Sequence, residues 1–203
     1  MKFNIAKQGG VAAQLVFEEK IEGGYLNHLK EKELFSGKAE EVYYTLDSNL
    51  KAQLFIGLGK EEKIDLEVLR KTFFKAASEL LKNKVEEVEL NIPKLNNLCN
   101  YKMAEAIAEG MLHATYKYDK FKSDRKEQTE ITVNYNPEKG KEDRAEKGIN
   151  EAVKLMEAVF LTRDLVNQPA NVIYPETLAQ IAKEKLEAKG AKVTMEAEID
   201  RID

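Results

Sequence analysis

The sequence has no tryptophan and a single cysteine among its 203 residues. One cysteine, Cys99, excludes an internal disulfide framework, so a packed core rather than cross-links must stabilise the fold. The first residues also lack the basic stretch and apolar run of a secretory signal. Together these absences predict a protein of the reducing cytoplasm.

Long hydrophobic runs are missing as well, because no apolar stretch approaches the roughly 18 residues that predict a membrane span. The composition, 43% hydrophobic and 33% charged, is ordinary for a globular protein with a real core. With a net charge of -4 and an isoelectric point near 5.5, the chain lacks the basic balance expected of a nucleic-acid-binding protein. Nucleic-acid binding is therefore the weakest functional hypothesis.

Proline is scarce, and two of the four prolines mark a junction near the carboxyl end. Pro169 pushes its predecessor out of helical geometry, so we expect a long helix to end near Asn167 and an extended crossing to follow. Pro175 opens a new helix, since the first turn does not use its missing N–H. Gly190 is expected to stop that helix, and residues 191–197 alternate like a strand.

One helix and one strand cannot bury a core, because independent folding below roughly 40 residues needs disulfides, metals or a partner. We therefore expect residues 169–203 to be the truncated start of a second α/β domain. The boundaries predicted are 1–140 for the first domain, 141–168 for a linker helix and 169–203 for that start.

Alternating apolar residues predict the strands of the first domain, at 3–6, 11–17, 41–46, 51–58, 85–92 and 129–135. Gly9 and Gly10 predict a tight turn, and so a hairpin of the first two strands. Asp47 and Asn49 predict the turn that pairs the third strand with the fourth. The continuous apolar run of residues 54–56 predicts the central strand, covered on both faces.

Helical spacing of apolar residues predicts a short helix around 26–34 and longer ones at 66–81, 100–115 and 142–166. Asp65 and Asn100 are the expected caps of the second and third. Glu142 and Asp143 place negative charge at the positive end of the last. Strands mixed with helices of this length predict a three-layer α/β domain with a mixed sheet flanked by helices.

Three stretches resemble one protein family, that of leucyl (cytosol) aminopeptidases. Residues 161–179, LTRDLVNQPANVIYPETLA, are similar to the family's interdomain junction. Residues 104–123, AEAIAEGMLHATYKYDKFKS, resemble a helix ending in an aromatic and acidic turn, and LFIGLGK at 54–60 resembles a buried strand with its glycine turn. The likeness covers nearly the whole chain, but only the amino-terminal part of a family member.

The resemblance implies a macro-like first domain in a hexameric metallo-exopeptidase that removes amino-terminal residues from peptides. It also implies two divalent ions, zinc or manganese, in a carboxy-terminal catalytic domain, where they would polarise the scissile carbonyl and activate a water. The family signature close to NTDAEGRL does not occur here. Matching motifs therefore assigns no catalytic, cofactor-binding or metal-binding residue to this chain.

Several residues still have to be weighed as sites. Gly57 and Gly59 follow a strand and could cradle a phosphate, but no third glycine or GxxxxGK[ST] follows, so a structural turn is the prediction. His28 and His113 have no cysteine or carboxylate at zinc-like spacing, which predicts no structural metal. Cys99 lies at a predicted helix start, where a thiol pKa can fall, but a packed side chain is the expected role.

The region after residue 115 mixes aromatic and basic residues. Tyr116, Tyr118 and Phe121 could stack on bases, but we expect them to close the preceding helix against the sheet or to touch a neighbouring subunit. Interrupting acids make the basic residues beside them a solvated loop rather than a phosphate site: Lys117, Lys120, Lys122, Arg125 and Lys126. The carboxylate pairs are expected to be solvated strand ends: Glu18 with Glu19, Glu40 with Glu41, and Glu86 with Glu87.

The sequence thus predicts the non-catalytic amino-terminal portion of a leucyl aminopeptidase, serving scaffolding, subunit contacts and access to the active site. The parent would be a cytoplasmic two-metal hydrolase acting on peptides, in which this portion alone is inactive. The alternative is a stand-alone macro-like module that binds ADP-ribose.

Overall fold

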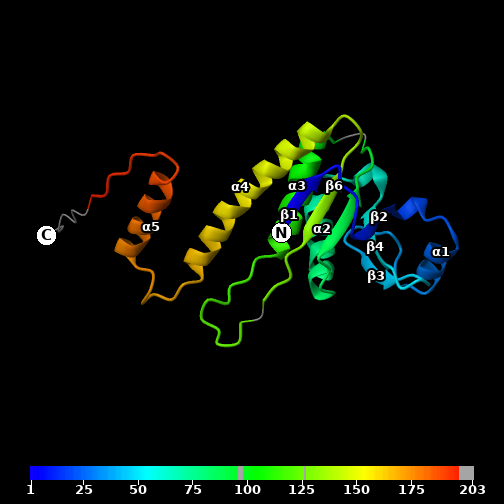
Figure 1. Cartoon of the computed structure of the whole chain (residues 1–203), viewed down its shortest axis with the longest axis horizontal. Coiled ribbons are helices and arrows are strands. Elements are labelled where there is room, and N and C mark those ends of the chain that lie inside the picture. Colours follow the sequence, from blue (N-terminus) through cyan, green and yellow to red (C-terminus); the bar gives the residue numbers. More distant parts are fainter. Residues whose placement is uncertain (96–97, 126, 197–203) are drawn as a thin grey trace. The chain divides into compact units, whose positions relative to one another are not determined.

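The computed structural model describes residues 1–95, 98–125 and 127–196. Two compact units divide the chain, residues 1–158 and 159–203. The first unit contains a six-stranded mixed sheet with the strand order β1-β6-β5-β2-β4-β3 (Figure 1). Its strands are β1 (Lys2–Ile5), β2 (Val11–Phe17), β3 (Val42–Leu46), β4 (Ala52–Gly59), β5 (Glu87–Asn91) and β6 (Thr132–Asn136). An α/β fold with a mixed sheet is therefore confirmed.

The predicted hairpin of the first two strands is wrong. β1 pairs in parallel with β6, and β2 lies between β4 and β5, in parallel with both. Gly9 and Gly10 have positive φ angles, as a turn requires, but a Cβ on Gly10 would overlap the backbone of Glu87. These glycines therefore let the connecting loop approach β5, rather than reversing the chain onto β2.

β3 and β4 form the one predicted strand pair that is confirmed, antiparallel with Val42 opposite Ile56. Asp47 makes their turn, because its carboxylate accepts hydrogen bonds from the N–H groups of Asn49 and Lys51 at 2.8 and 2.9 Å. β4 is buried on both faces, as its continuous apolar run predicts. Its position is next to the edge strand, so the prediction of a central place in the sheet is wrong.

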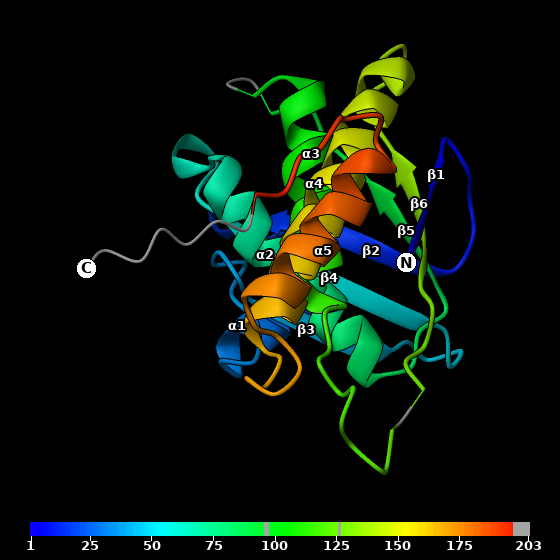
Figure 2. The same ribbon diagram turned by 90° about the vertical axis from the view of Figure 1, so that its left-hand side faces the viewer.

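Three helices cover one face of the sheet: α2 (Leu66–Lys82), α3 (Asn100–Ala114) and the amino-terminal part of α4 (Glu142–Val166) (Figures 1 and 2). Alternate strand residues such as Leu54, Ile56 and Val133 meet the apolar faces of these helices in the main core. The Asp65 carboxylate caps α2 by accepting from the N–H of Val68 at 2.7 Å. Cys99, not Asn100, occupies the N-cap of α3, and its side chain makes no capping hydrogen bond.

The opposite face of the sheet is covered by a short helix and by loops. α1 (Gly24–Glu31) and Phe35 pack against Val16 and Phe55 in a second apolar cluster. Over β5 and β6 the same face is polar, because fully buried Asn134 donates to the Gly9 carbonyl and to Glu87 at 3.1 and 2.8 Å. The loop carrying Gly9 and these side chains therefore take the place of a covering helix there.

The second unit contains the carboxyl end of α4, a turn and α5 (Pro175–Glu187). The expected extended crossing is instead a turn, in which the N–H groups of Val172 and Ile173 donate to the Pro169 carbonyl at 2.9 and 3.1 Å. Gly190 has a positive φ, as predicted for a helix stop. Residues 191–196 form no strand, contrary to the alternation of their side chains, and Ala197 lies outside the described residues.

Candidate functional site

Gly57 and Gly59 are explained by packing. A Cβ on Gly57 would overlap the carbonyl oxygen of Lys38, and one on Gly59 would lie 3.1 Å from the Cβ of Ala39. The N–H of Gly59 also donates to the Gly37 carbonyl at 2.9 Å. The glycines thus admit the Gly37–Ala39 segment against β4, which is the structural role predicted for them.

The two histidines lie apart, on different helices. His28 is exposed on α1, and His113 packs edge-on against Phe74 of α2 with ring centroids 5.9 Å apart. Within the part of the chain that the structure describes, no three histidine, cysteine or carboxylate side chains gather as a metal site would need. Cys99 is exposed rather than packed, contrary to expectation.

Of the paired glutamates, Glu19, Glu41 and Glu87 accept hydrogen bonds from other parts of the chain, so the expectation of solvated strand ends is wrong for these three. Glu41 accepts from the hydroxyl of Ser36 at 2.9 Å. A hydrogen bond from the Glu61 N–H, at 2.8 Å, is the main cause that lowers the pKa of Glu19 below its usual value. Glu86 is exposed. These contacts organise loops and bring no two carboxylates together across a cleft.

A cleft of about 510 Å³ lies between α2, α3 and α4 in the first unit. In its wall Arg70 pairs with Glu109, whose side chain is nearly buried. This hydrogen bond raises the pKa of Arg70. Sequence spacing does not reveal the pair, because 39 positions separate its members. Its contacts make it a link between α2 and α3.

The aromatic residues after α3 differ in how far they are buried. The rings of Tyr118 and Phe121 meet edge-on with centroids 6.2 Å apart, and the Tyr118 hydroxyl is buried. Phe121 is 58% exposed, so the expectation that it closes α3 against the sheet is wrong. Of the basic residues named with it, Lys126 lies outside the described residues.

An apolar groove is the main surface feature of the second unit. It has a volume of about 810 Å³, and its lining residues come from the end of α4, the turn and α5: Thr162, Leu165, Val166, Ile173, Tyr174, Pro175, Leu178, Ala179 and Ala182. Val166 is 78% exposed and Leu178 is 45% exposed. Burying such side chains stabilises a protein by about 1.5–3 kcal/mol each, so this surface is suited to bind further polypeptide.

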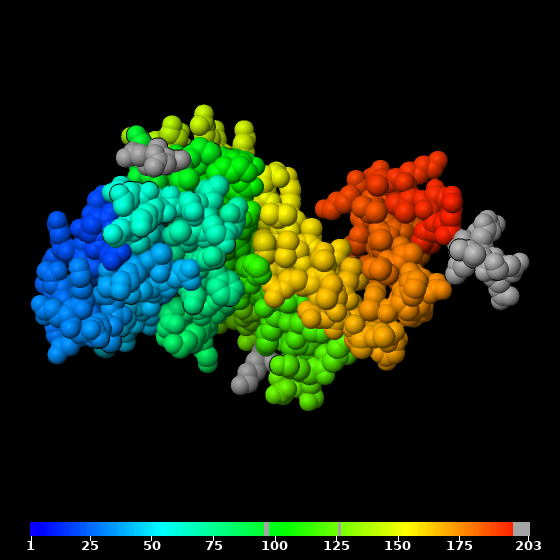
Figure 3. Space-filling view, turned by 180° about the vertical axis from the view of Figure 1, so that it is seen from behind, coloured from blue at the N-terminus to red at the C-terminus, as the bar shows by residue number. Residues whose placement is uncertain are grey.

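Local sequence explains the shape of the groove. The Thr177 hydroxyl accepts from the N–H of Tyr174 at 2.9 Å, which fixes the first turn of α5. Leu178 and Ala182 then lie one turn apart on α5, facing the same side. Described residues 159–196, the orange and red surface in Figure 3, include no buried residue. The second unit therefore has an apolar surface but no core of its own.

Comparison with known proteins now identifies the chain's relatives. Residues 5–125 match the model of the cytosol aminopeptidase family, N-terminal domain. The chain belongs to the cytosol aminopeptidase family. It is 96% identical over 195 residues to a probable cytosol aminopeptidase of Treponema denticola, covering 96% of this chain and 41% of the relative. A probable cytosol aminopeptidase of Clostridium tetani is 37% identical over 198 residues, with 95% and 41% covered.

Solved structures of similar fold include two enzymes. A mutant of tomato leucine aminopeptidase superimposes with a TM-score of 0.76 at 19% identity, covering 94% of this chain and 43% of that one. The bottromycin maturation enzyme BotP gives a TM-score of 0.73 at 19% identity, covering 91% and 38%. The chain thus has the fold of the matching part of these two structures, and it spans about two fifths of the length of its curated relatives.

In the described part of the chain, no helix is both long enough and apolar enough to cross a membrane.

Proposed function

We propose that this chain is the non-catalytic amino-terminal portion of a metal-dependent leucyl aminopeptidase. The observation that carries the proposal is the match to the family's N-terminal domain model, together with a span of 41% of the Treponema denticola relative. In the full-length protein, this portion would serve as scaffold, contribute subunit contacts and shape access to the active site. The cytoplasm is the proposed location.

The parent enzyme would remove amino-terminal residues from peptides with the help of two zinc or manganese ions, as a hexamer. We assign the ions and the hydrolytic chemistry to the part of the relatives that this chain does not span. Bound there, the metals would polarise the scissile carbonyl and lower the pKa of an attacking water. The residues described above would hold neither ion.

The apolar groove of the second unit supports this division. Val166 and Leu178 leave water only when more polypeptide packs on them, and a helix with no buried residue gains little stability by itself. We assign the covering polypeptide to the segment that follows in the relatives. The groove would thus join the linker to the catalytic domain.

A fusion tests this proposal. Residues 1–203 are joined to the remaining carboxy-terminal part of the Treponema denticola relative, which is 96% identical over the shared region. The fusion is expected to hydrolyse leucine p-nitroanilide with manganese or zinc. Leu178→Asp in the fusion is expected to lower activity at least about tenfold by placing a charge in the groove.

Leu34→Asp provides the matched control, because Leu34 is also exposed but lies in the first unit after α1. It is expected to leave the activity of the fusion unchanged. An inactive but folded fusion, or equal effects of the two aspartates, would contradict the proposal.

The alternative is an ADP-ribose-binding module, and the packing of two glycines argues against it. Gly57 and Gly59 contact the backbone and side chain of the Gly37–Ala39 segment, where a phosphate would otherwise have to approach. A calorimetric titration of the chain with ADP-ribose is expected to be flat. Saturable heat would restore the alternative.

A further inference from the structure

The segment between α3 and β6 forms an ordered projection, which we call the arm (residues 116–125). The N–H of Lys122 donates to the Asp119 carbonyl at 3.0 Å, closing a turn. Lys117 pairs with Asp119 at 3.0 Å, and Arg125 donates to the carbonyl of Lys120. In Figures 1 and 3 the arm, coloured green, projects from the body of the first unit. These contacts stabilise the turn at the tip of the arm.

The tip of the arm presents an aromatic ring among cations. Phe121 is 58% exposed, although a large aromatic side chain gains about 1.5–3 kcal/mol from burial. The ammonium of Lys120 lies 5.7 Å from the centroid of this ring. Four cations against two carboxylates make the arm basic on a chain of net charge -4: Lys117, Lys120, Lys122 and Arg125 against Asp119 and Asp124. Aromatic residues are enriched at the centres of protein interfaces, and charged groups at the rim steer a partner of opposite charge.

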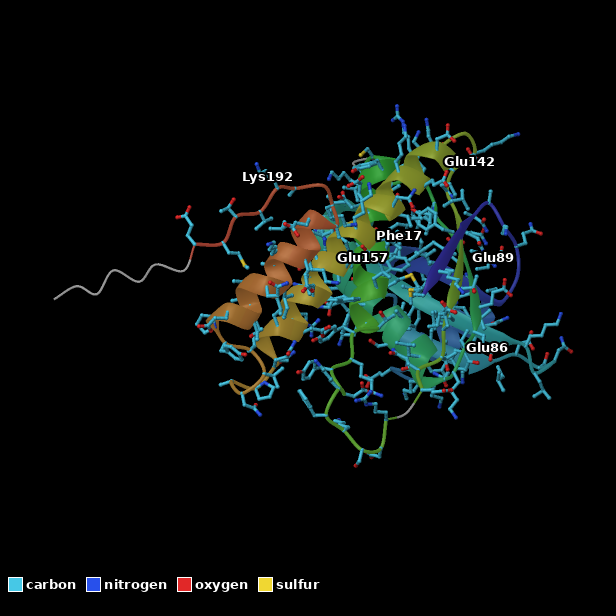
Figure 4. All side chains as sticks on the ribbon, turned by 60° about the vertical axis from the view of Figure 1, so that its left-hand side comes forward. Phe17, Glu86, Glu89, Glu142, Glu157 and Lys192 are labelled. Carbon is cyan, nitrogen blue, oxygen red and sulfur yellow. The ribbon has the colours of Figure 1, made fainter. Side chains whose placement is uncertain are left out.

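A pocket of about 550 Å³, which we call the edge pocket, has the complementary character. Its apolar lining includes Val11, Ala12 and Val85, and three carboxylates outnumber two ammonium groups around it: Asp47, Glu86 and Glu87 against Lys51 and Lys84. Glu86, labelled in Figure 4, is exposed. The pocket is large enough for one phenyl ring and places negative charge beside it.

Topology places the arm and the edge pocket at the same edge of the sheet. The pocket is lined by residues at the amino-terminal ends of β2, β4 and β5. The arm leads into the amino-terminal end of β6, which runs parallel to β5. Both features therefore lie where the parallel strands begin.

We propose that two copies of this chain associate through this edge, with the arm of each copy inserted in the edge pocket of the other. A two-fold axis makes such an exchange reciprocal, because both contacts come from the same surface of each copy. Phe121 is the anchor, and Lys120 and Lys122 face the carboxylates of the partner pocket. This contact deepens the subunit-contact part of the proposed function, and it predicts association without any catalytic domain.

Sedimentation velocity of the full 203-residue chain over a range of concentrations tests the proposal. The chain is expected to form dimers, and Phe121→Ala is expected to raise their dissociation constant at least about tenfold, as truncation of a central anchor does. Phe74→Ala is the control, since Phe74 is an exposed aromatic residue on α2 that lines neither surface. It is expected to leave dimerisation unchanged.

Charge reversal makes the test specific. K120E/K122E reverses the charge of the arm, and E86K reverses the charge at the edge pocket. Each variant alone is expected to be monomeric, because its arm and its pocket then carry charge of the same sign. Mixed together, they form a pair in which both reciprocal contacts join opposite charges, so dimers are expected to return.

A wild-type chain that stays monomeric at all concentrations overturns the proposal, as does a mixture that stays monomeric while circular dichroism shows both variants folded. Such a result leaves the fusion experiment unaffected, because activity of the fusion tests the family function and not this contact.

Discussion

At the residue scale, Gly57 and Glu109 have structural partners within the fold. Gly57 could be predicted as a glycine-requiring position from its place after an apolar strand. The reason for the glycine could not be predicted, because it is the close approach of the Lys38 carbonyl. Lys38 belongs to a loop for which the sequence pattern indicates no structure. The same limit applies to Glu109, whose partner Arg70 lies on another helix.

Gly57→Ala is expected to lower the free energy of unfolding by about 1–3 kcal/mol, because the added methyl group must displace backbone. Urea unfolding followed by circular dichroism measures the change. Gly24→Ala is the matched control, since no atom lies within 4 Å of the position of its Cβ, and less than about 1 kcal/mol is expected there. Equal effects would show that packing does not select glycine at position 57.

Glu89, labelled in Figure 4, lies on the polar face of the sheet and makes a contact that we expect to be sensitive to acid. Hydrogen bonds from the Gly9 N–H, at 2.9 Å, and then from Asn91 hold its pKa below the ordinary 4.5. A carboxyl whose pKa is lowered by folding stabilises the protein above its unfolded pKa, and this contribution is lost as pH falls through the folded value. Stability should therefore decline below about pH 4.5.

The check is Glu89→Gln. Its free energy of unfolding is expected to lie closest to that of the wild type at acid pH and furthest below it near pH 7. A difference that is constant across this range would contradict the assignment.

At the element scale, periodicity predicted most helices and strands, whereas the sheet order could not be read from it. β1 and β6 lie at opposite ends of the first domain's sequence, yet they pair in the sheet with Phe3 opposite Val133. No local pattern in the sequence indicates this pairing. Described residues 191–196 alternate like a strand but form none, because a strand requires a partner strand for its backbone hydrogen bonds. The groove's apolar positions Leu178 and Ala182 followed directly from helical spacing.

Removing the Arg70–Glu109 pair, which links α2 and α3, is expected to lower the stability of the fold measurably. Arg70→Ala leaves the Glu109 carboxylate nearly buried without its cation, so the free energy of unfolding is expected to fall by about 1–3 kcal/mol. Lys82→Ala removes a cation from the exposed pair with Glu79 on α2 and is expected to cost at most about 1 kcal/mol. Urea unfolding of both variants compares them, and a cost for Arg70→Ala no greater than for Lys82→Ala would contradict the role given to the Arg70–Glu109 pair.

α5 is expected to open far more readily than α2 or α3. It contains no buried residue, whereas the other two helices supply much of the main core. Amide hydrogen exchange measured by mass spectrometry should therefore show rapid exchange in residues 175–187 and slow exchange in 66–82 and 100–114. Equal protection in all three helices would mean that the second unit is stable as it stands.

At the scale of the whole molecule, the chain combines a folded α/β unit with a second unit whose apolar groove is exposed. The match to the family model, residues 5–125, lies within the first unit, and the second unit has a surface suited to bind further polypeptide. Because residues 5–125 match the family's N-terminal domain, the proposal locates hydrolysis outside this chain.

The most direct measurement is an assay of the purified 203-residue chain on leucine p-nitroanilide, with manganese or zinc added and the fusion to the Treponema denticola part as the positive control. We predict no release of p-nitroaniline above background from the chain alone. Metal-dependent turnover that stays with the chain through purification would contradict the central claim.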